Sequence, residues 1–302
     1  MDIENTPSEK ILVVGELLAD IISERDVATL ASPTSFQINQ GGSSSNLSAN
    51  LKWLGVDTHL IATVGNDNLG TLLIDELKKV GLSDEHIARS ACRQTSIVLV
   101  GKNPHTPDFI AYRSADIAIK RVDTALIESC SIIHSTAFAL SKEPARTNII
   151  NALIKAHQLG KTISIDWNFA PSIWQEDDGK DVFRKICKLY PLLKMSIDDL
   201  ERFANESMDH TQAKEWLDQL NVKAICLTCG KDGVWFKQHG QQWVHKPALQ
   251  VKEVAGVTGA GDAFWSGFLA HYLKRESIDN CVAHALEIAK LKIELPYPLY
   301  KN

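Results

Sequence analysis

The chain has 302 residues, of which 44% are hydrophobic and 23% charged, and its formal net charge is −5. This length suffices for one large α/β domain or two small ones. An acidic balance without a basic block argues against nucleic acid as the main partner. Residues 1–10 lack the apolar core of a signal peptide, and the apolar run 11–22 is too short to span a bilayer. We therefore expect a cytoplasmic protein with no membrane partner.

Apolar strand-like runs alternate with helical patterns along most of the chain. The predicted strands cover residues 11–14, 59–64, 97–100, 132–134, 162–165 and 224–227. The predicted helices cover residues 45–54, 69–80, 145–159, 198–203, 212–220 and 263–273. Such alternation favours an α/β fold, in which helices cover both faces of a mostly parallel sheet.

Two stretches break this alternation, because they contain short strand-like pieces with no helix between them. They are residues 18–40 and 95–120, and we expect them to form a small β lid beside the main sheet. No linker rich in proline, glycine or serine divides the chain. A single domain of residues 1–302 with this lid is therefore predicted.

The six cysteines are scattered, which is typical of reduced thiols, and only Cys226 and Cys229 form a C-x-x-C pair. A zinc site needs two more ligands at short spacing, and no such residues stand nearby. We interpret residues 224–229 as a buried strand that runs into a glycine turn.

The strongest chemical signal is Thr258-Gly-Ala-Gly-Asp-Ala-Phe264. Its small residues let backbone N–H groups approach a ligand, and the apolar stretch that follows predicts a helix beginning there. The N-terminus of a helix attracts a phosphate or a developing anion. A carboxylate beside such an anion cradle suits phosphoryl transfer to a hydroxyl group. The alternative is that Asp262 only caps the helix, and spacing alone leaves both open.

This segment resembles the C-terminal signature of the ribokinase-like (PfkB) kinases, and Gly41-Gly-Ser-Ser-Ser-Asn46 resembles their N-terminal signature. Residues 64–70 and 227–233 are also similar to the family, so the resemblance extends from Gly15 to His284. Residues 166–174 and 194–203 are most similar to fructokinases. The resemblance implies a ribokinase-like, doubly wound fold and an ATP-dependent, Mg²⁺-dependent sugar kinase.

Residue roles follow from the resemblance at matching positions only. Asp262 would be the base, and the anion cradle would be Gly259, Ala260 and Gly261. The implied sugar-binding residues are Asp20, Gly41, Gly42, Asn46 and Arg113. The implied nucleotide-binding residues are Thr228, Gly230, Gly233, Ser196 and His284, with Asp199 placing the waters of Mg²⁺. The structural alternatives are a helix cap for Asn46, a solvated charge for Arg113, a structural histidine for His284 and a surface acid for Asp199.

Three departures from the family pattern bear on specificity. Gly256 stands where the family usually has an aspartate that helps to bind a monovalent cation, so we expect weak potassium dependence. Ala170 replaces an arginine of the fructokinase segment, which leaves the sugar open. The chain also ends soon after residues 292–296, so by the same resemblance we expect an abbreviated C-terminus.

We accordingly predict an ATP-dependent kinase of a free sugar, with a fructose-like hexose favoured and a homodimer formed through the lid. The alternatives are a 2-keto-3-deoxygluconate kinase, a nucleoside kinase and a non-catalytic sugar sensor. The presence of Asp262 argues against the sensor, because a protein that only binds sugar needs no base.

Overall fold

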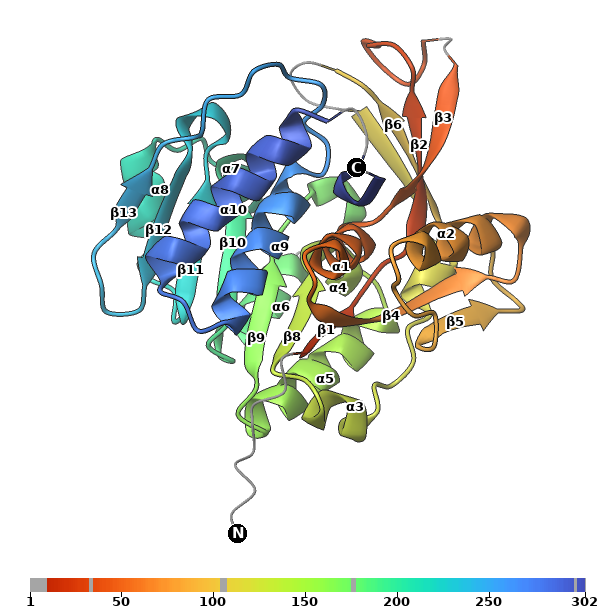
Figure 1. The fold of residues 1–302 in the computed structure, drawn as a ribbon, viewed down its shortest axis with the longest axis horizontal. Helices are drawn as coiled ribbons and strands as arrows, with labels where there is room; N and C mark the ends of the chain where they lie inside the picture. The colour runs from red at the N-terminus through yellow and green to blue at the C-terminus, as the bar shows by residue number, and fades with distance from the viewer. Residues whose placement is uncertain (1–9, 33–34, 104–107, 175–177, 296–297, 302) are drawn as a thin grey trace.

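The computed structural model describes residues 10–32, 35–103, 108–174, 178–295 and 298–301, and all statements below concern these ranges (Figure 1). Residues 1–9, on which the expectation about targeting rests, lie outside them. No helix in the described ranges is both long enough and apolar enough to cross a membrane.

The main sheet contains nine strands. They are β1 (Lys10–Val14), β4 (Asp57–Gly65), β5 (Ile87–Ser90), β8 (Ile132–Thr136), β9 (Thr162–Asp166), β10 (Leu192–Ser196), β11 (Ala224–Thr228), β12 (Val234–Gln238) and β13 (Val244–Lys246). Their order is β13-β12-β11-β10-β9-β8-β1-β4-β5. The pairs from β5 to β11 are parallel, whereas β12 and β13 add antiparallel pairs at one edge.

Helices cover both faces of this sheet. One face carries α1 (Ser43–Trp53), α2 (Asn68–Lys79), α9 (Ala260–Leu273) and α10 (Ile278–Ile293). The other carries α3 (Thr124–Glu128), α4 (Ala137–Leu140), α5 (Ala145–Gln158), α6 (Asp178–Cys187), α7 (Ile197–Ala204) and α8 (His210–Leu217).

Alternation along β1 shows how the core is divided between these two layers. Ile11 and Val13 pack into the apolar cluster under α1 and α9, while Leu12 and Val14 pack into the cluster under α5. Successive side chains of a strand point to opposite faces, so a strand covered on both sides is apolar throughout. The predicted doubly wound, mostly parallel sheet is confirmed.

A second, small sheet projects from the main body at the upper right of Figure 1. It consists of β2 (Leu18–Ser23), β3 (Phe36–Gly41), β6 (Ile97–Gly101) and β7 (Asp108–Tyr112), in the order β3-β2-β6-β7. These strands come from the two stretches that break the alternation, and the strand expected at residues 97–100 lies here. The C-terminal 3-10 turn, Leu299–Lys301, lies beside α1 and the base of the small sheet.

Candidate active site

Asp262 lies in the first turn of α9, where two side chains of α1 hold its carboxylate. Ser43 Oγ donates a hydrogen bond to Oδ1 at 2.6 Å, and Asn46 Nδ2 donates one to Oδ2 at 2.9 Å. Each carboxylate oxygen has a further lone pair, so Asp262 can still accept a proton from a bound hydroxyl group. The N-termini of α1 and α9 therefore meet at one carboxylate.

The first turn of α9 also presents free backbone donors. Gly259 is the N-cap of α9 and has φ of 80°, a conformation that favours glycine. Because glycine has no side chain, Gly259 does not cap the helix with a hydrogen bond. The N–H of Ala260 donates to the Val257 carbonyl at 3.1 Å, whereas those of Gly261 and Asp262 have no partner in the described ranges. Unpaired donors and the helix dipole favour an anion here.

Lys194 of β10 provides a buried positive charge behind this turn. Its Nζ lies 2.9 and 3.0 Å from the carboxylate oxygens of Asp166 on β9. A Cβ atom at Gly261 would lie 2.9 Å from the same Nζ, so glycine lets the helix approach the ammonium group this closely. Burial opposes the charge of Lys194, but the carboxylates of Asp166, Asp199 and Asp262 hold its pKa above the usual value.

The pKa of Asp262 itself is raised by burial. The hydrogen bonds from Ser43 and Asn46 and the charges of Lys194 and Lys292 oppose this shift. A carboxylate with a raised pKa takes up a proton more readily, which suits a general base. Trp265 fastens the helix that carries Asp262, because its Nε1 donates to Ser164 Oγ of β9 at 3.0 Å.

A cavity of about 190 Å³ lies between the small sheet, α1 and the loop before α9. Its polar lining includes Asp20, Asn39, Asn46, Lys102, Lys292 and Tyr300. The size of this cavity, and its lining of hydrogen-bond acceptors, amides and cations, fit a small polyol. Asp20, Asn46 and the Gly259 turn thus line a single cavity.

Asp20 projects from β2 into this cavity, and the neighbouring Gly41 makes room for it. A Cβ atom at Gly41 would lie 2.2 Å from the Asp20 carboxylate. Burial, followed by the charges of Asp262 and Glu16, raises the pKa of Asp20 to about 7. The protonation state of this side chain therefore changes near neutral pH.

The N-terminus of α1 is positioned by a buried carboxylate that the sequence did not indicate as a site residue. Glu16 accepts hydrogen bonds from the Ser44 N–H at 3.2 Å, Ser44 Oγ at 2.8 Å and Thr136 Oγ1 at 2.9 Å. Gly42, the N-cap of α1, has φ of 100°, and a Cβ there would lie 2.7 Å from the Glu16 carbonyl. This packing explains Gly42 without a ligand.

The cavity is also lined or supported by residues that the sequence did not indicate. Gln40 donates to Ser45 Oγ at 2.8 Å and to Asn46 Oδ1 at 3.1 Å, and it accepts a hydrogen bond from Tyr300 Oη. Lys292, on the last turn of α10, is buried, and its Cε lies 3.7 Å from a Cβ placed on Gly259. Its charge was the one signal that could have indicated Lys292 from the sequence.

Of the residues expected to bind the nucleotide, Ser196 ends β10, Thr228 ends β11, and Gly230 and Gly233 lie in the turn after β11. Gly230 has φ of 54° with no atom within 4 Å of an added Cβ, so its surroundings are open. Gly233 differs, because a Cβ there would lie 2.2 Å from the Lys246 carbonyl. Packing against the chain after β13 therefore accounts for Gly233.

Ser196 and Asp199 form the capping box of α7. Asp199 accepts from Ser196 Oγ at 2.5 Å and from Arg202 Nη2 at 2.7 Å, so it has structural partners. Its charge still acts on Lys194 together with those of Asp166 and Asp262. Carboxylate oxygens of this kind are the ligands that a hard divalent cation such as Mg²⁺ prefers.

Arg113 and His284 lie outside the lining of the cavity. Arg113 is bonded to Asp116, the Phe138 carbonyl and Ser141 Oγ, although its Nη2 has no partner in the described residues. His284 stacks on His271 with ring centroids 3.6 Å apart. Their roles in binding sugar and nucleotide stay predictions.

The C-x-x-C pair is part of the core. Cys226 is fully buried in β11, and Cys229 is buried in the turn that follows. Within the described ranges, the group of side chains arranged like metal ligands contains neither cysteine. The buried-strand interpretation is confirmed.

Comparison with known proteins adds to this geometry. Residues 8–299 match the model of the pfkB family carbohydrate kinases. The ATP-dependent 6-phosphofructokinase of Thermoanaerobacterium thermosaccharolyticum is 31% identical over 286 residues, which are 94% of this chain and 87% of that protein.

Solved structures give the same result. The fructokinase of Halothermothrix orenii superposes with a TM-score of 0.83 at 32% identity, covering 93% of this chain and 98% of that one. A sugar kinase of Pyrococcus horikoshii in complex with ATP has a TM-score of 0.82 at 25% identity, covering 96% and 94%. The ribokinase-like fold predicted from the sequence is confirmed.

Proposed function

Because the chain belongs to the pfkB family of carbohydrate kinases, we propose that it transfers the γ-phosphoryl group of ATP to a hydroxyl group of a free hexose. The observation that carries this proposal is the Asp262 carboxylate, which is held by Ser43 and by Asn46, a residue that lines a polyol-sized cavity. Fructose is the favoured hexose, because residues 166–174 and 194–203 are similar to fructokinases.

In the proposed mechanism, Asp262 accepts the proton of the attacking hydroxyl group. The free N–H groups of Gly261 and Asp262 donate to the oxygens on which negative charge develops, and Lys292 adds positive charge beside Gly259. Such preorganised donors act where charge appears in the transition state. Asp20 on β2 and Asn46 on α1 orient the sugar in the cavity.

ATP and Mg²⁺ complete the site. The nucleotide would lie along Thr228 and the open side of Gly230, and bound Mg²⁺ would neutralise charge on the phosphates. Asp166 and Asp199 would hold this ion through water, and Lys194 limits the repulsion between their carboxylates. ATP as donor and six cysteines without a disulfide favour the cytoplasm as its place of action.

A phosphorylated hexose is the second candidate substrate. Lys102 and Lys292 both line the cavity, so it offers two cations to an anionic substituent. A relative of 31% identity that is named an ATP-dependent 6-phosphofructokinase supports the same alternative. A 2-keto-3-deoxygluconate substrate would use these cations in a similar way.

An ADP-release assay over a panel of acceptors tests this proposal. We expect fructose to give the highest kcat/KM, against fructose 6-phosphate, 2-keto-3-deoxygluconate and adenosine. A preference for fructose 6-phosphate or for the keto acid would make that compound the proposed substrate in place of the free hexose, and the proposed mechanism would be unchanged. A preference for adenosine would refute the sugar assignment, and no turnover with any acceptor would favour a sugar-binding protein.

We further propose that the small sheet is both a lid and a dimer interface. Its inner face carries Asp20 and Asn39 in the cavity lining. On its outer face, cross-strand pairing aligns Ile38, Ile21, Leu99 and Ile110, and Ile38 and Ile110 are 55% and 42% exposed. Exposed apolar rows of this kind mark interaction surfaces.

Light scattering after size exclusion tests this interface. The wild-type protein should elute as a dimer and the Ile38→Lys variant as a monomer, because a buried lysine without a partner is unfavourable. A wild-type monomer at micromolar concentration would refute the interface.

A further inference from the structure

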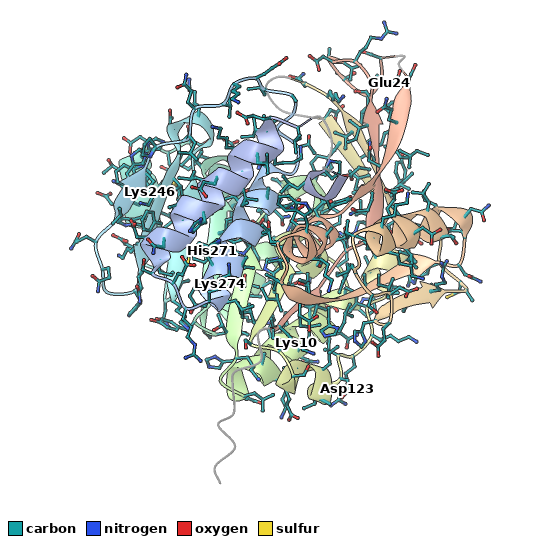
Figure 2. All side chains as sticks on the ribbon, viewed as in Figure 1. Lys10, Glu24, Asp123, Lys246, His271 and Lys274 are labelled. Carbon is teal, nitrogen blue, oxygen red and sulfur yellow. The ribbon has the colours of Figure 1, made fainter. Side chains whose placement is uncertain are left out.

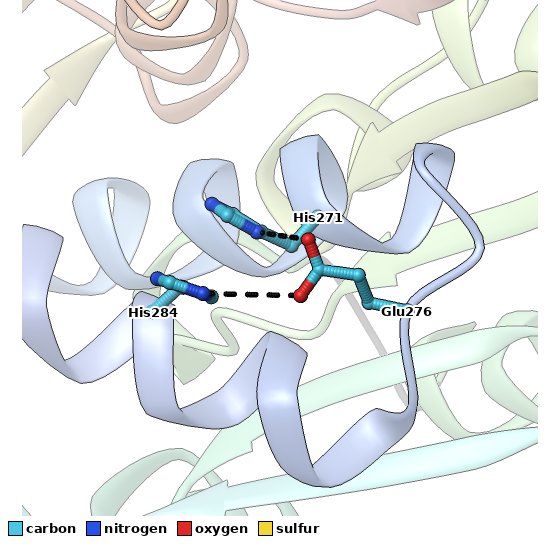
Figure 3. Close-up of side chains that lie close together, drawn as sticks. All are labelled: His271, Glu276 and His284. Atoms are coloured by element: carbon cyan, nitrogen blue, oxygen red, sulfur yellow. Dashed lines mark hydrogen bonds and ion pairs between the residues drawn. The ribbon is translucent and has the colours of Figure 1, made fainter.

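A cluster of metal-ligand side chains lies at the end of α9 opposite to Asp262. His271 is in the last turn of α9, Glu276 follows the helix, and His284 is in α10 (Figure 3). Nine residues of helix separate His271 from Asp262, or about 14 Å at 1.5 Å per residue. Figure 2 shows His271 near Lys274, at the turn between the two helices.

The end of α9 brings Glu276 back over its own helix. The N–H of Glu276 donates to the His271 carbonyl at 3.4 Å, and the N–H of Arg275 donates to the Tyr272 carbonyl at 2.9 Å. Arg275 has φ of 62°, so the chain ends the helix in the pattern of a Schellman motif. A Schellman motif usually has glycine at the position of Arg275. Here the motif directs the carboxylate of Glu276 toward His271.

The three side chains converge on a volume of the size of a metal site. His271 Nδ1 lies 2.7 Å from Glu276 Oε1, and His284 Nε2 lies 3.8 Å from Oε2. One ligand atom from each residue can be chosen so that all lie within 4.8 Å of one another. Tetrahedral ligands at 2.0–2.2 Å from zinc are about 3.4 Å apart. The contacts of 2.7 and 3.8 Å lie on either side of this value.

A second carboxylate supports one of the histidines. Glu287, one turn after His284 on α10, lies with Oε2 3.2 Å from His284 Nδ1. A histidine that binds a metal commonly donates its other ring N–H to a carboxylate, which fixes the tautomer and orients the ligating nitrogen. With Nδ1–H bound to Glu287, the Nε2 atom of His284 is left as an acceptor facing Glu276.

We propose that His271, Glu276 and His284 bind a divalent transition-metal ion, with Zn²⁺ as the best match, which fastens the end of α9 to α10. Two imidazoles and one carboxylate are ligands that zinc accepts, and water would complete the coordination. The cluster lies at the end of α9 opposite to Asp262, and the proposal does not depend on the proposed function.

Binding requires one local adjustment. The two rings are stacked with an interplanar angle of 12°, whereas a metal ion lies close to the plane of each imidazole that binds it. The rings must therefore rotate about their Cβ–Cγ bonds, a torsion with a broad energy minimum. His271 and His284 have side chains that are 19% and 39% exposed, which leaves room for this rotation.

Calorimetric titration of the untagged, chelator-treated protein with Zn²⁺ tests the proposal. We expect one equivalent to bind with a Kd below about 100 µM and the Tm to rise with zinc concentration, because binding stabilises the folded state. Replacing zinc by Co²⁺ should give the visible absorption of a cobalt ion bound to nitrogen and oxygen ligands.

Variants separate this site from adventitious surface binding. His271→Ala and His284→Ala should abolish saturable binding, and Glu287→Gln should weaken it about 10- to 100-fold by releasing the ring of His284. His157→Ala, at an exposed histidine of α5, is the matched control and should bind as the wild type does. Circular dichroism checks folding of each variant.

The proposal is overturned by the absence of saturable binding to the wild type. Equal binding by the wild type and His284→Ala would also overturn it. Glu287→Gln decides the matter if an alanine variant does not fold, because Glu287 is exposed and its replacement keeps both ligating histidines.

Discussion

The two ends of α9 carry polar clusters that are built in different ways. At the N-terminal end, Asp262 is held by Ser43 and Asn46, which precede it by 219 and 216 residues. At the C-terminal end, Glu276 bonds His271, only five residues before it. The first cluster needs the whole fold to bring α1 to α9, whereas the second needs one turn between neighbouring helices.

This difference assigns separate tasks to the two ends. The N-terminal end combines free N–H groups, a helix dipole and a carboxylate with a raised pKa beside a cavity. The C-terminal end has two partly exposed histidines and a carboxylate on the turn between two helices. Chemistry is therefore expected at one end and a structural role at the other.

The largest expected effect is that of Asp262→Asn on turnover. Loss of a general base typically lowers kcat about 100- to 10,000-fold. The ADP-release assay measures it, with Asp198→Asn, an exposed acid on α7, as the control that should keep wild-type activity. A kcat within about threefold of wild type in Asp262→Asn would remove Asp262 from the role of base.

A smaller effect concerns pH, because the pKa of Asp20 is raised to about 7. The carboxylate is the better acceptor for sugar hydroxyls, so KM for the hexose should fall by about tenfold between pH 6 and pH 8. The stability contribution has the opposite sign: the neutral form is favoured in the folded state, so this contribution declines as pH rises from about 4 to 7. In the Asp20→Asn variant, KM should no longer change between pH 6 and pH 8. If KM still changes with pH in this variant, another titrating group is responsible.

Potassium should have little effect. Gly256 offers no side-chain ligand, its N–H is bonded to the Ile293 carbonyl at 3.2 Å, and Lys292 provides a fixed positive charge near Gly259. At constant ionic strength, replacing tetramethylammonium by potassium should change kcat by less than about twofold. A rise above about tenfold would show an intact cation site and a different path for residues 253–258.

The smallest effect is expected from His271→Ala. This change removes a side chain about 14 Å along α9 from Asp262, so kcat/KM should stay within about twofold of wild type. A large loss of activity would show that the two ends of α9 are coupled, and it would contradict the assignment of different tasks to them.

The sequence predicted the main sheet well where strands are uninterrupted apolar runs. It missed β10 because Lys194 interrupts the run, and a lysine is buried there only through its pairing with Asp166. It missed α10 as a complete element, because only residues 274–277 separate it from α9. The failure to predict β10 is explained only by its pairing with other strands, which is not a property of the local sequence.

The candidate site was predicted in part for similar reasons. Motif positions identified Asp262, Asn46 and Asp20, which line or adjoin one cavity. Ser43, Gln40 and Tyr300 were missed: Ser43 is a variable position of its motif, and Tyr300 reaches the cavity only because the C-terminal turn folds against α1. Gly233 was assigned to the nucleotide, yet the Lys246 carbonyl already requires a glycine there.

The central claim is that Asp262 takes the proton during the chemical step, and the first turnover tests it most directly. Rapid-quench measurement of sugar phosphate, with ATP and the hexose prebound, reports this step without product release. We predict that Asp262→Asn slows the first turnover by the same factor, about 100-fold or more, as kcat, while both substrates bind within about threefold of wild type. A first turnover as fast as that of the wild type would contradict the account.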